Sequence, residues 1–263
     1  MDLAPGLRVA LAPNPGFMTG PGTNQYLLGD LQVDAAPLDE ENARRLDAEG
    51  VTPRALLLTH VHPDHAGGAP ALRERSGLPL AVHNSRASYV VGGAPLAPER
   101  PLADGDELAW QGGRIVVVHT PGHESGHCCV WEPERRWLFT GDTILSTGTT
   151  VIAPPDGDMR AYMESLDRLR ALEPAVVFPA HGPPVHDAVA LIEQYLAHRR
   201  MREAQILDAV AAGIDEIPAL VERCYAELHP ALRWVAALTV RAHLDKLAAE
   251  GRVAADGERW QVA

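Results

Sequence analysis

The sequence predicts an α/β sandwich over residues 1–198, with sheets inside and helices outside, followed by a small helical domain over residues 199–263. Two observations indicate the sandwich: short apolar runs alternate with segments of helical periodicity, and polar clusters rich in His and Asp follow several of these runs. A third observation, the change after residue 198 to helical segments and a terminal hairpin, indicates the second domain. The hydrophobic share of 46% in 263 residues is ample for a core of this size.

In the N-terminal half, apolar runs predict strands at residues 7–11, 25–28, 31–33, 55–58 and 78–83, the first of them at a sheet edge. Helical periodicity predicts helices at residues 38–49, 66–75 and 84–91. Gly50 is expected to cap the end of the first helix, and Asp64 to cap the start of the second. Residues 95–105 are expected to form a loop.

Further along, strands are expected at residues 115–119, 128–131, 137–140 and 175–179, and helices at residues 159–172 and 188–198. After residue 198, helices at 202–211, 217–227 and 232–250 precede a hairpin of residues 252–254 and 260–262 around Asp256-Gly257. Three helices and a hairpin predict a winged-helix-like domain. Because this segment has 9 Arg and Lys against 10 Asp and Glu, packing or dimerisation is favoured over nucleic-acid binding.

Composition excludes some functions. The net charge is -12 and the chain has no long basic run, which argues against nonspecific binding of duplex DNA. The three cysteines are sparse, and the adjacent Cys128 and Cys129 would point to opposite faces of a strand, so we expect a reducing compartment, the cytoplasm. We expect no signal peptide, since residues 1–20 lack a basic start and an apolar core, and no membrane span, since no apolar run reaches about 18 residues.

The polar cluster at residues 59–68 directly follows the apolar run at residues 55–58. His60 and His62 are two apart, so an extended backbone points both imidazoles the same way, and Asp64 and His65 follow at once. Imidazole and carboxylate groups are ligands suited to zinc, and manganese or iron is also accepted by such sites. The density of this pattern favours a metal site over chance clustering among 12 histidines.

Three more polar residues follow apolar runs and are flanked by Gly or Pro: His123, Asp142 and His181. Loops at strand ends bring such side chains together when the strands share a sheet edge. One zinc ion takes three or four protein ligands, so seven residues suffice for two divalent ions if one carboxylate bridges them. His127, four residues after His123, is expected to be a structural hydrogen-bonding residue instead.

The pattern His60-x-His62-x-Asp64-His65, followed by His123, Asp142 and His181, resembles the metallo-β-lactamase fold superfamily over residues 1–198. This resemblance implies an αβ/βα sandwich with a dinuclear site at one edge of the sheets and a metal-bridging water or hydroxide as nucleophile. It assigns His60, His62 and His123 to one metal, assigns Asp64, His65 and His181 to the other, and makes Asp142 the bridge. Asp64 would also act in catalysis, by orienting or deprotonating the nucleophile.

The same resemblance places Asp34 beneath the metal site, where it would support a ligand histidine without binding metal. The superfamily usually continues that strand with Thr-Gly. Here the chain has Ala35-Ala36-Pro37, so the hydrogen bonding of this loop departs from the usual pattern.

Longer stretches, at residues 14–19, 22–26, 148–151, 162–166 and 198–203, resemble the lactamase-β-like-protein-2 branch over nearly the whole chain. Animal members of that branch are endoribonucleases specific for single-stranded RNA, and fungal relatives are thioesterases that release polyketides from acyl carrier protein. The resemblance therefore implies hydrolysis of single-stranded RNA, with Asn24 or Arg residues at the rim of the site touching the substrate. The alternative is a thioester or carboxylic ester of a small molecule or carrier.

Charge bears on this choice, because residues 1–198 carry 25 acidic and 14 basic side chains, which suits the ester better than RNA. Hydrolysis of β-lactams is disfavoured, since class B lactamases lack the bridging carboxylate that Asp142 supplies here. The sequence allows a homodimer but does not require one.

Overall fold

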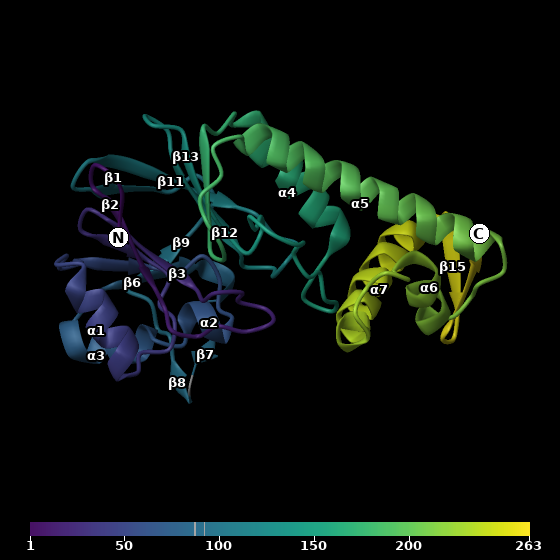
Figure 1. The fold of residues 1–263 in the computed structure, drawn as a ribbon, viewed down its shortest axis with the longest axis horizontal. Helices are drawn as coiled ribbons and strands as arrows, with labels where there is room; N and C mark the ends of the chain where they lie inside the picture. The colour runs from purple at the N-terminus through teal and green to yellow at the C-terminus, as the bar shows by residue number, and fades with distance from the viewer. Residues whose placement is uncertain (87, 92) are drawn as a thin grey trace.

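Two β-sheets pack face to face, and helices cover the outer face of each, in a computed structural model that describes residues 1–86, 88–91 and 93–263 (Figure 1). The first sheet has seven strands in the order β1 (Asp2–Ala4), β2 (Leu7–Leu11), β3 (Asn24–Leu28), β4 (Leu31–Val33), β5 (Ala55–Leu57), β6 (Leu80–His83) and β9 (Arg100–Leu102). The second has five: β10 (Glu107–Trp110), β11 (Gly113–His119), β12 (Cys128–Glu132), β13 (Trp137–Gly141) and β14 (Val176–Pro179). This is the predicted αβ/βα sandwich.

Strand direction changes within each sheet. Strands β1 to β4 are antiparallel, whereas β4, β5, β6 and β9 run parallel. In the second sheet, β10 to β13 are antiparallel and β14 is parallel to β13. The carboxyl ends of β4, β5, β13 and β14 meet at one edge, where the Cys128 amide donates to the Thr59 carbonyl and joins the two sheets.

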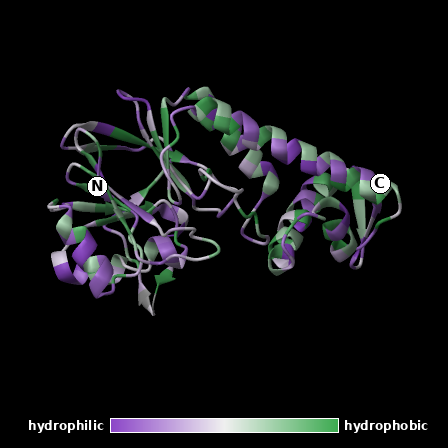
Figure 2. Cartoon of the chain, viewed as in Figure 1, coloured by the Kyte–Doolittle hydropathy of each residue, from purple (hydrophilic) through white to green (hydrophobic). Residues whose placement is uncertain are grey.

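The core between the sheets forms because alternate residues of a strand point to opposite faces. On β13, Phe139 faces the first sheet, and its ring lies 5.1 Å from that of Tyr26 on β3. Its neighbour Leu138 faces the other way and packs among the helices. Figure 2 shows strands that are largely hydrophobic and helices that alternate between hydrophobic and hydrophilic stripes. This pattern is expected because the strands are buried on both faces and the helices on one.

The first sheet is covered by α1 (Glu40–Ala48), α2 (Pro63–Ala66) and α3 (Ala69–Ser76), and the second by α4 (Met159–Ala171) and α5 (Ala188–Ala211). Helix α1 begins at Asp39, whose side chain accepts a hydrogen bond from the Asn42 amide, and α4 begins in the same way at Asp158. Two short elements, β7 (Val90–Val91) and β8 (Ala94–Pro95), pair outside the sheets.

The C-terminal part has α6 (Ile217–Cys224), α7 (Arg233–Ala249) and a hairpin of β15 (Val253–Asp256) and β16 (Arg259–Val262), as predicted. These elements share a core of their own, which includes Ile206 from the end of α5. Helix α5 thus runs from the sandwich into this domain (Figure 1).

Several predictions of single elements were wrong. Residues 188–211 form one helix, α5, because no Gly or Pro interrupts them; the predicted boundary between residues 198 and 199 lies inside it. Asp64 lies within α2, which follows His62, and Gly67-Gly68 separates α2 from α3. A Cβ at Gly68 would lie 2.1 Å from the Ala36 carbonyl oxygen, so this close approach requires glycine.

At the sheet edges, β1 lies outside β2, so the strand at residues 7–11 is not an edge strand. The loop expected at residues 95–105 contains β9. The helix expected at residues 84–91 is a 3₁₀ turn at Asn84–Arg86 followed by β7, and residue 87 of that prediction lies outside the described part of the chain. Among the helices of the described residues, none is both long and apolar enough to cross a bilayer.

Candidate metal centre

The structure brings all seven predicted ligands to the sheet edge where the two sheets meet. They form two groups, and within each group the ligand atoms lie within 4.8 Å of one another. The first group comprises His60, His62, His123 and Asp142, and the second comprises Asp64, His65 and His181. Asp64 and His65 lie in α2 and the other five in loops after β5, β11, β13 and β14, so the fold of the sandwich is what assembles the site.

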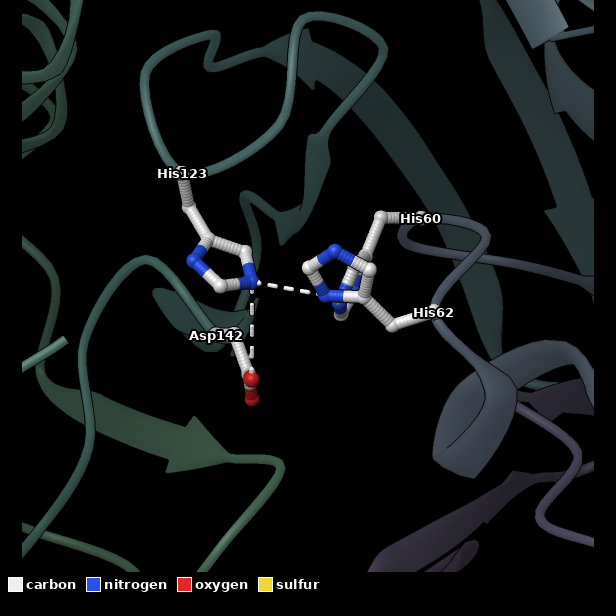
Figure 3. A group of neighbouring side chains, drawn as sticks. All are labelled: His60, His62, His123 and Asp142. Carbon is white, nitrogen blue, oxygen red and sulfur yellow. Dashed lines mark hydrogen bonds and ion pairs between the residues drawn. The ribbon is translucent and has the colours of Figure 1, made fainter. Parts of the chain in front are cut away.

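In the first group the three imidazoles converge on one point (Figure 3). His62 Nδ1 lies 3.0 Å from His60 Nε2 and 3.0 Å from His123 Nε2. Asp142 Oδ2 lies 3.7 Å from His123 Nε2 and completes the group. Three imidazole nitrogens and one carboxylate oxygen form a donor set that suits a divalent transition metal.

The second group shares Asp142 with the first. Asp142 Oδ1 lies 3.4 Å from His65 Nε2 and 3.3 Å from His181 Nε2, so its two oxygens face different groups. Asp64 Oδ2 lies 3.3 Å from His65 Nε2 and 3.2 Å from His181 Nε2. One carboxylate between two histidine groups is the arrangement in which an aspartate can bridge two cations.

Hydrogen bonds on the far side of three of the imidazoles fix which nitrogen faces the centre. His65 Nδ1 donates to Asp34 Oδ2 at 2.9 Å, His123 Nδ1 to the Val151 carbonyl at 2.7 Å, and His181 Nδ1 to the Gly22 carbonyl at 3.2 Å. Asp34 also accepts a bond from the Thr59 amide through Oδ1 at 2.8 Å, and it is buried. Asp34 therefore has the expected place beneath the site, supporting a histidine.

Two buried polar atoms of the site have no hydrogen-bond partner among the described residues: His65 Nε2 and Asp142 Oδ1. Buried polar atoms are nearly always paired, because leaving one unpaired costs about 1–3 kcal/mol. Both atoms face the other ligand atoms, so bound cations are the natural partners. The residues present thus fit a metal centre, and the chain has the donor set that divalent metals require.

The charges of the metal-free protein agree with this interpretation. Burial would lower the pKa of His65, but the carboxylates of Asp142, Asp64 and Asp34 raise it well above its ordinary value. Burial is likewise outweighed at His181, where Asp142 and Asp64 raise the pKa to about 9. Histidines this readily protonated show that the site presents negative charge to whatever cation occupies it.

Two supporting residues surround the ligands. Glu124, which follows His123, is buried; its Oε2 accepts a bond from the Val61 amide between His60 and His62, and Oε1 pairs with Arg86 at 2.6 Å. Glu124 was not predicted from the sequence, although an acidic side chain beside a ligand histidine indicates such a supporting role. The buried His127 accepts a bond from the Asp142 amide at 3.2 Å, which confirms the predicted structural role.

Asn24 does not have the place expected of a substrate-binding residue. It is buried, and its amide donates to the carbonyls of Pro179 and Gly182 at 2.9 and 2.8 Å. These bonds anchor the segment that carries His181. Because its amide group is used within the protein, Asn24 positions the segment that carries the ligand His181.

The cysteines take no part in the site. All three lie in the described part of the chain, buried and unbridged. Burial raises the pKa of Cys129 to about 12, so the thiol stays protonated and a thiolate nucleophile is excluded there.

Comparison with known families agrees with the fold and the site. Residues 19–181 match the model of the Metallo-beta-lactamase superfamily, and residues 217–260 match that of the Beta-lactamase associated winged helix domain. The chain therefore belongs to the metallo-β-lactamase superfamily, whose members are generally hydrolases, and it carries a winged helix at its C-terminal end. The predicted superfamily and the predicted winged-helix-like domain are thus both confirmed.

Particular relatives extend over nearly the whole chain. A Beta-lactamase-like protein 2 homolog of Drosophila melanogaster is 34% identical over 264 residues, which are 92% of this chain and 88% of the relative. Lactamase-like protein adaB of Aspergillus niger is 31% identical over 276 residues, 95% of this chain and 84% of the relative.

Solved structures of the same superfamily also superpose on this chain. The metallo-beta-lactamase family protein TTHA1429 of Thermus thermophilus is 25% identical and superposes with a TM-score of 0.83 over 100% of both chains. The structure of TTHA1623 in a di-iron-bound form is 29% identical, with a TM-score of 0.55 over 66% of this chain and 93% of that one.

Proposed function

We propose that this protein is a dinuclear metal-dependent hydrolase that cleaves phosphodiester bonds of single-stranded RNA, with zinc as its metal. The observation that carries the dinuclear centre is the position of Asp142, with one oxygen facing each of two ligand groups. The di-iron form of TTHA1623 supports two ions and keeps iron as an alternative to zinc. His60, His62 and His123 would hold one ion, Asp64, His65 and His181 the other, and Asp142 both.

When bound, two divalent cations lower the pKa of water toward about 7 and polarise a substrate oxygen, which supplies nucleophile and electrophilic assistance. The side chains supply orientation. Asp34 holds the His65 ring so that Nε2 faces the centre, and the Val151 carbonyl does the same for His123. The protein thus fixes the donor atoms before substrate arrives, which is the condition for electrostatic stabilisation of a transition state.

Asp64 is the proposed catalytic side chain. Burial would raise its pKa, but the charge of His65 and the nearby His181 imidazole, whose Nε2 lies 3.2 Å from Oδ2, hold that pKa far below the ordinary value. The carboxylate is therefore ionised at neutral pH, and its side chain is 26% exposed at the edge of the site. These properties favour a group that orients the attacking water by accepting a hydrogen bond over one that retains its proton.

The choice of RNA is supported by a loop beside the site. Between β2 and β3, Gly16 and Gly20 pair across a turn whose tip exposes Phe17 (74%) and Met18 (51%). The same loop supplies the Gly22 carbonyl that accepts from the ligand His181. An exposed aromatic ring on a loop that contacts a ligand histidine suits the stacking of an unpaired base.

One observation favours the alternative, hydrolysis of an acyl thioester or a related carboxylic ester. The sandwich carries 25 acidic and 14 basic side chains over residues 1–198, and RNA-binding surfaces are usually basic. For RNA the bound cations would have to supply the positive field. A neutral ester needs no such field.

A direct comparison of substrates tests the proposal. Zinc-loaded protein is incubated with end-labelled single-stranded RNA, with the same RNA as a duplex, with an acyl-thioester of a pantetheine analogue and with a β-lactam. We expect cleavage of the single strand, and its loss in His60→Ala, which excludes a contaminating nuclease. Turnover of the thioester without RNA cleavage would establish the alternative, turnover of the β-lactam alone would establish the activity that the bridging carboxylate disfavours, and no turnover of any substrate would refute both hydrolase proposals.

The compartment is also a proposal. Three free, buried cysteines in the described residues are compatible with a reducing environment such as the cytoplasm. Fractionation of the source cells, with a cytosolic and a membrane marker, tests it.

A further inference from the structure

Helix α5 reaches the segment that follows Asp142. The Tyr195 hydroxyl accepts a hydrogen bond from the Leu145 amide at 3.0 Å. One turn later, the Arg199 guanidinium donates through Nη2 to the Thr150 carbonyl at 2.5 Å. Residues four apart lie on the same side of a helix, so one face of α5 holds this segment at two points.

The held segment contacts two metal-ligand candidates directly. The Thr150 side chain donates through Oγ1 to the carbonyl of Asp142 at 2.8 Å. The next residue, Val151, presents the carbonyl that accepts from His123 Nδ1 at 2.7 Å. A displacement of Thr150 and Val151 would therefore shift the backbone of one ligand and release the ring of another.

Arg199 itself is buried to an unusual degree. It is 1% exposed, its guanidinium carbon lies 5.1 Å from the centre of the Tyr162 ring, and its Nε has no hydrogen-bond partner among the described residues. Burying a guanidinium costs free energy unless other groups pair with its charge or its hydrogen-bond donors. Here the cation contacts a backbone carbonyl one residue from the His123 contact, and the Tyr162 hydroxyl donates to the Thr143 carbonyl next to Asp142.

The same face of α5 continues into the winged-helix domain. Glu203, four residues after Arg199, is buried and pairs with Lys246 of α7 at 2.7 Å and with Arg252 at 3.3 Å, just before β15. Tyr195 and Arg199 thus contact the segment behind the site, and Glu203 contacts the C-terminal domain. One rigid helix connects the two.

We propose that Arg199 is a positioning residue of the metal centre, which holds the Thr150–Val151 segment so that His123 and Asp142 present their ligand atoms to the first cation. Through α5, the winged-helix domain is then part of the support of that centre. This inference rests on the proposed dinuclear function. It concerns the first ligand group more than the second, since Thr150 and Val151 contact Asp142 and His123 directly. The second group meets the held segment at Ser146, whose hydroxyl donates to the His181 carbonyl at 3.3 Å.

A matched pair of variants tests this. Arg202, less than one turn further along α5, also stacks on a tyrosine, with its guanidinium carbon 4.3 Å from the Tyr225 ring centre, and it donates to the Cys224 carbonyl. Arg199→Met and Arg202→Met therefore remove the same kinds of contact, but only the first lies next to the metal centre. Thr150→Val keeps the side-chain shape and removes the hydroxyl that reaches Asp142.

The measurement is the affinity of full-length apoprotein for Zn²⁺, by competition with a chromogenic chelator, together with the visible spectrum of the Co²⁺-loaded protein. Contacts that orient metal ligands typically change metal affinity by about 10- to 100-fold. We expect Arg199→Met and Thr150→Val to weaken the binding of one Zn²⁺ ion, the one at the first ligand group, at least about tenfold and to change the Co²⁺ spectrum, with Arg202→Met close to the wild type. The double variant should be no weaker than the worse single variant, because both act through one segment.

Three results would overturn the inference: equal affinities and spectra for Arg199→Met and the wild type, equal losses in Arg199→Met and Arg202→Met, or additive losses in the double variant. Circular dichroism establishes whether each variant is folded. If Arg199→Met does not fold, Thr150→Val decides the question alone, and an unchanged affinity in that variant counts against the inference. Failure of the dinuclear proposal is distinguishable, because the wild type would then bind fewer than two Zn²⁺ ions.

Discussion

Replacing Asp34 by Asn tests whether Asp34 orients the ligand His65. Asp34 Oδ2 accepts from His65 Nδ1 at 2.9 Å, and Oδ1 accepts from the Thr59 amide at 2.8 Å. Asn is isosteric with Asp and has one acceptor oxygen instead of two. If that oxygen stays with the Thr59 amide, the side-chain amide faces His65 Nδ1 as a second donor, and the bond that fixes the ring is lost.

The magnitude follows from the bond removed. A hydrogen bond to an ionised carboxylate contributes about 1.5–3 kcal/mol, and each 1.4 kcal/mol is about a factor of ten in affinity. The variant should therefore bind the second zinc ion about 10- to 100-fold more weakly, in agreement with the usual effect of partners of ligand histidines. Folding should suffer less, because the bond to the Thr59 amide survives.

The assay is zinc competition with a chelator, accompanied by thermal unfolding. Asp104→Asn is the matched control: Asp104 also accepts from a backbone amide, that of His119 at 2.8 Å, and pairs with Arg168, yet it contacts none of the seven ligands. Equal zinc affinity in Asp34→Asn and Asp104→Asn would refute the argument that Asp34 acts by orienting His65.

Three further outcomes are expected. His60→Ala and Asp142→Ala should each abolish hydrolysis while the circular dichroism spectrum stays close to that of the wild type; full activity in either would contradict the assigned roles. Zinc affinity should rise with pH up to about 9, the pKa of His181 without bound metal, because a bound proton must leave before the ring can bind metal. Calorimetry in buffers of different ionisation enthalpy should detect this proton release. A zinc affinity that does not change with pH would contradict the prediction. Burial would raise the pKa of the Glu203 carboxyl, but His243 and Lys246, whose nitrogens lie 3.7 and 2.7 Å from Oε2, lower it from 4.5 to about 2. The contribution of Glu203 to stability is therefore complete above pH 4.5 and lost as pH falls toward 2. The wild type should therefore exceed Glu203→Gln in unfolding free energy by at most about 3 kcal/mol at pH 7, and the difference should shrink in acid; a difference that does not change with pH would show that the ion pairs do not carry it.

The ligands could be predicted from sequence because His60, His123, Asp142 and His181 each lie shortly after an apolar run. That placement puts them at the ends of strands. His60, His62 and His65 are also close in sequence, so local geometry alone aligns them. Asp142 and His181 required the further assumption that their strands are neighbours, which the pairing of β13 with β14 bears out.

What could not be predicted depends on contacts between distant residues. Asn24 was predicted to touch the substrate, but its buried amide donates to the carbonyls of Pro179 and Gly182, which lie more than 150 positions away in the chain. Glu124 has no periodic pattern to mark it, because it lies in a loop. The division of α5 at residue 198 followed the change to helical segments and a hairpin after that residue. It failed because no Gly or Pro interrupts the helix before Gly213.

Anomalous diffraction from crystals of the zinc-loaded protein tests the central claim most directly. Data on either side of the zinc absorption edge should show two peaks at the sheet edge. One should lie among His60, His62 and His123, the other among Asp64, His65 and His181, with one Asp142 oxygen toward each. A single peak, or peaks that Asp142 does not separate, would contradict the two-cation centre.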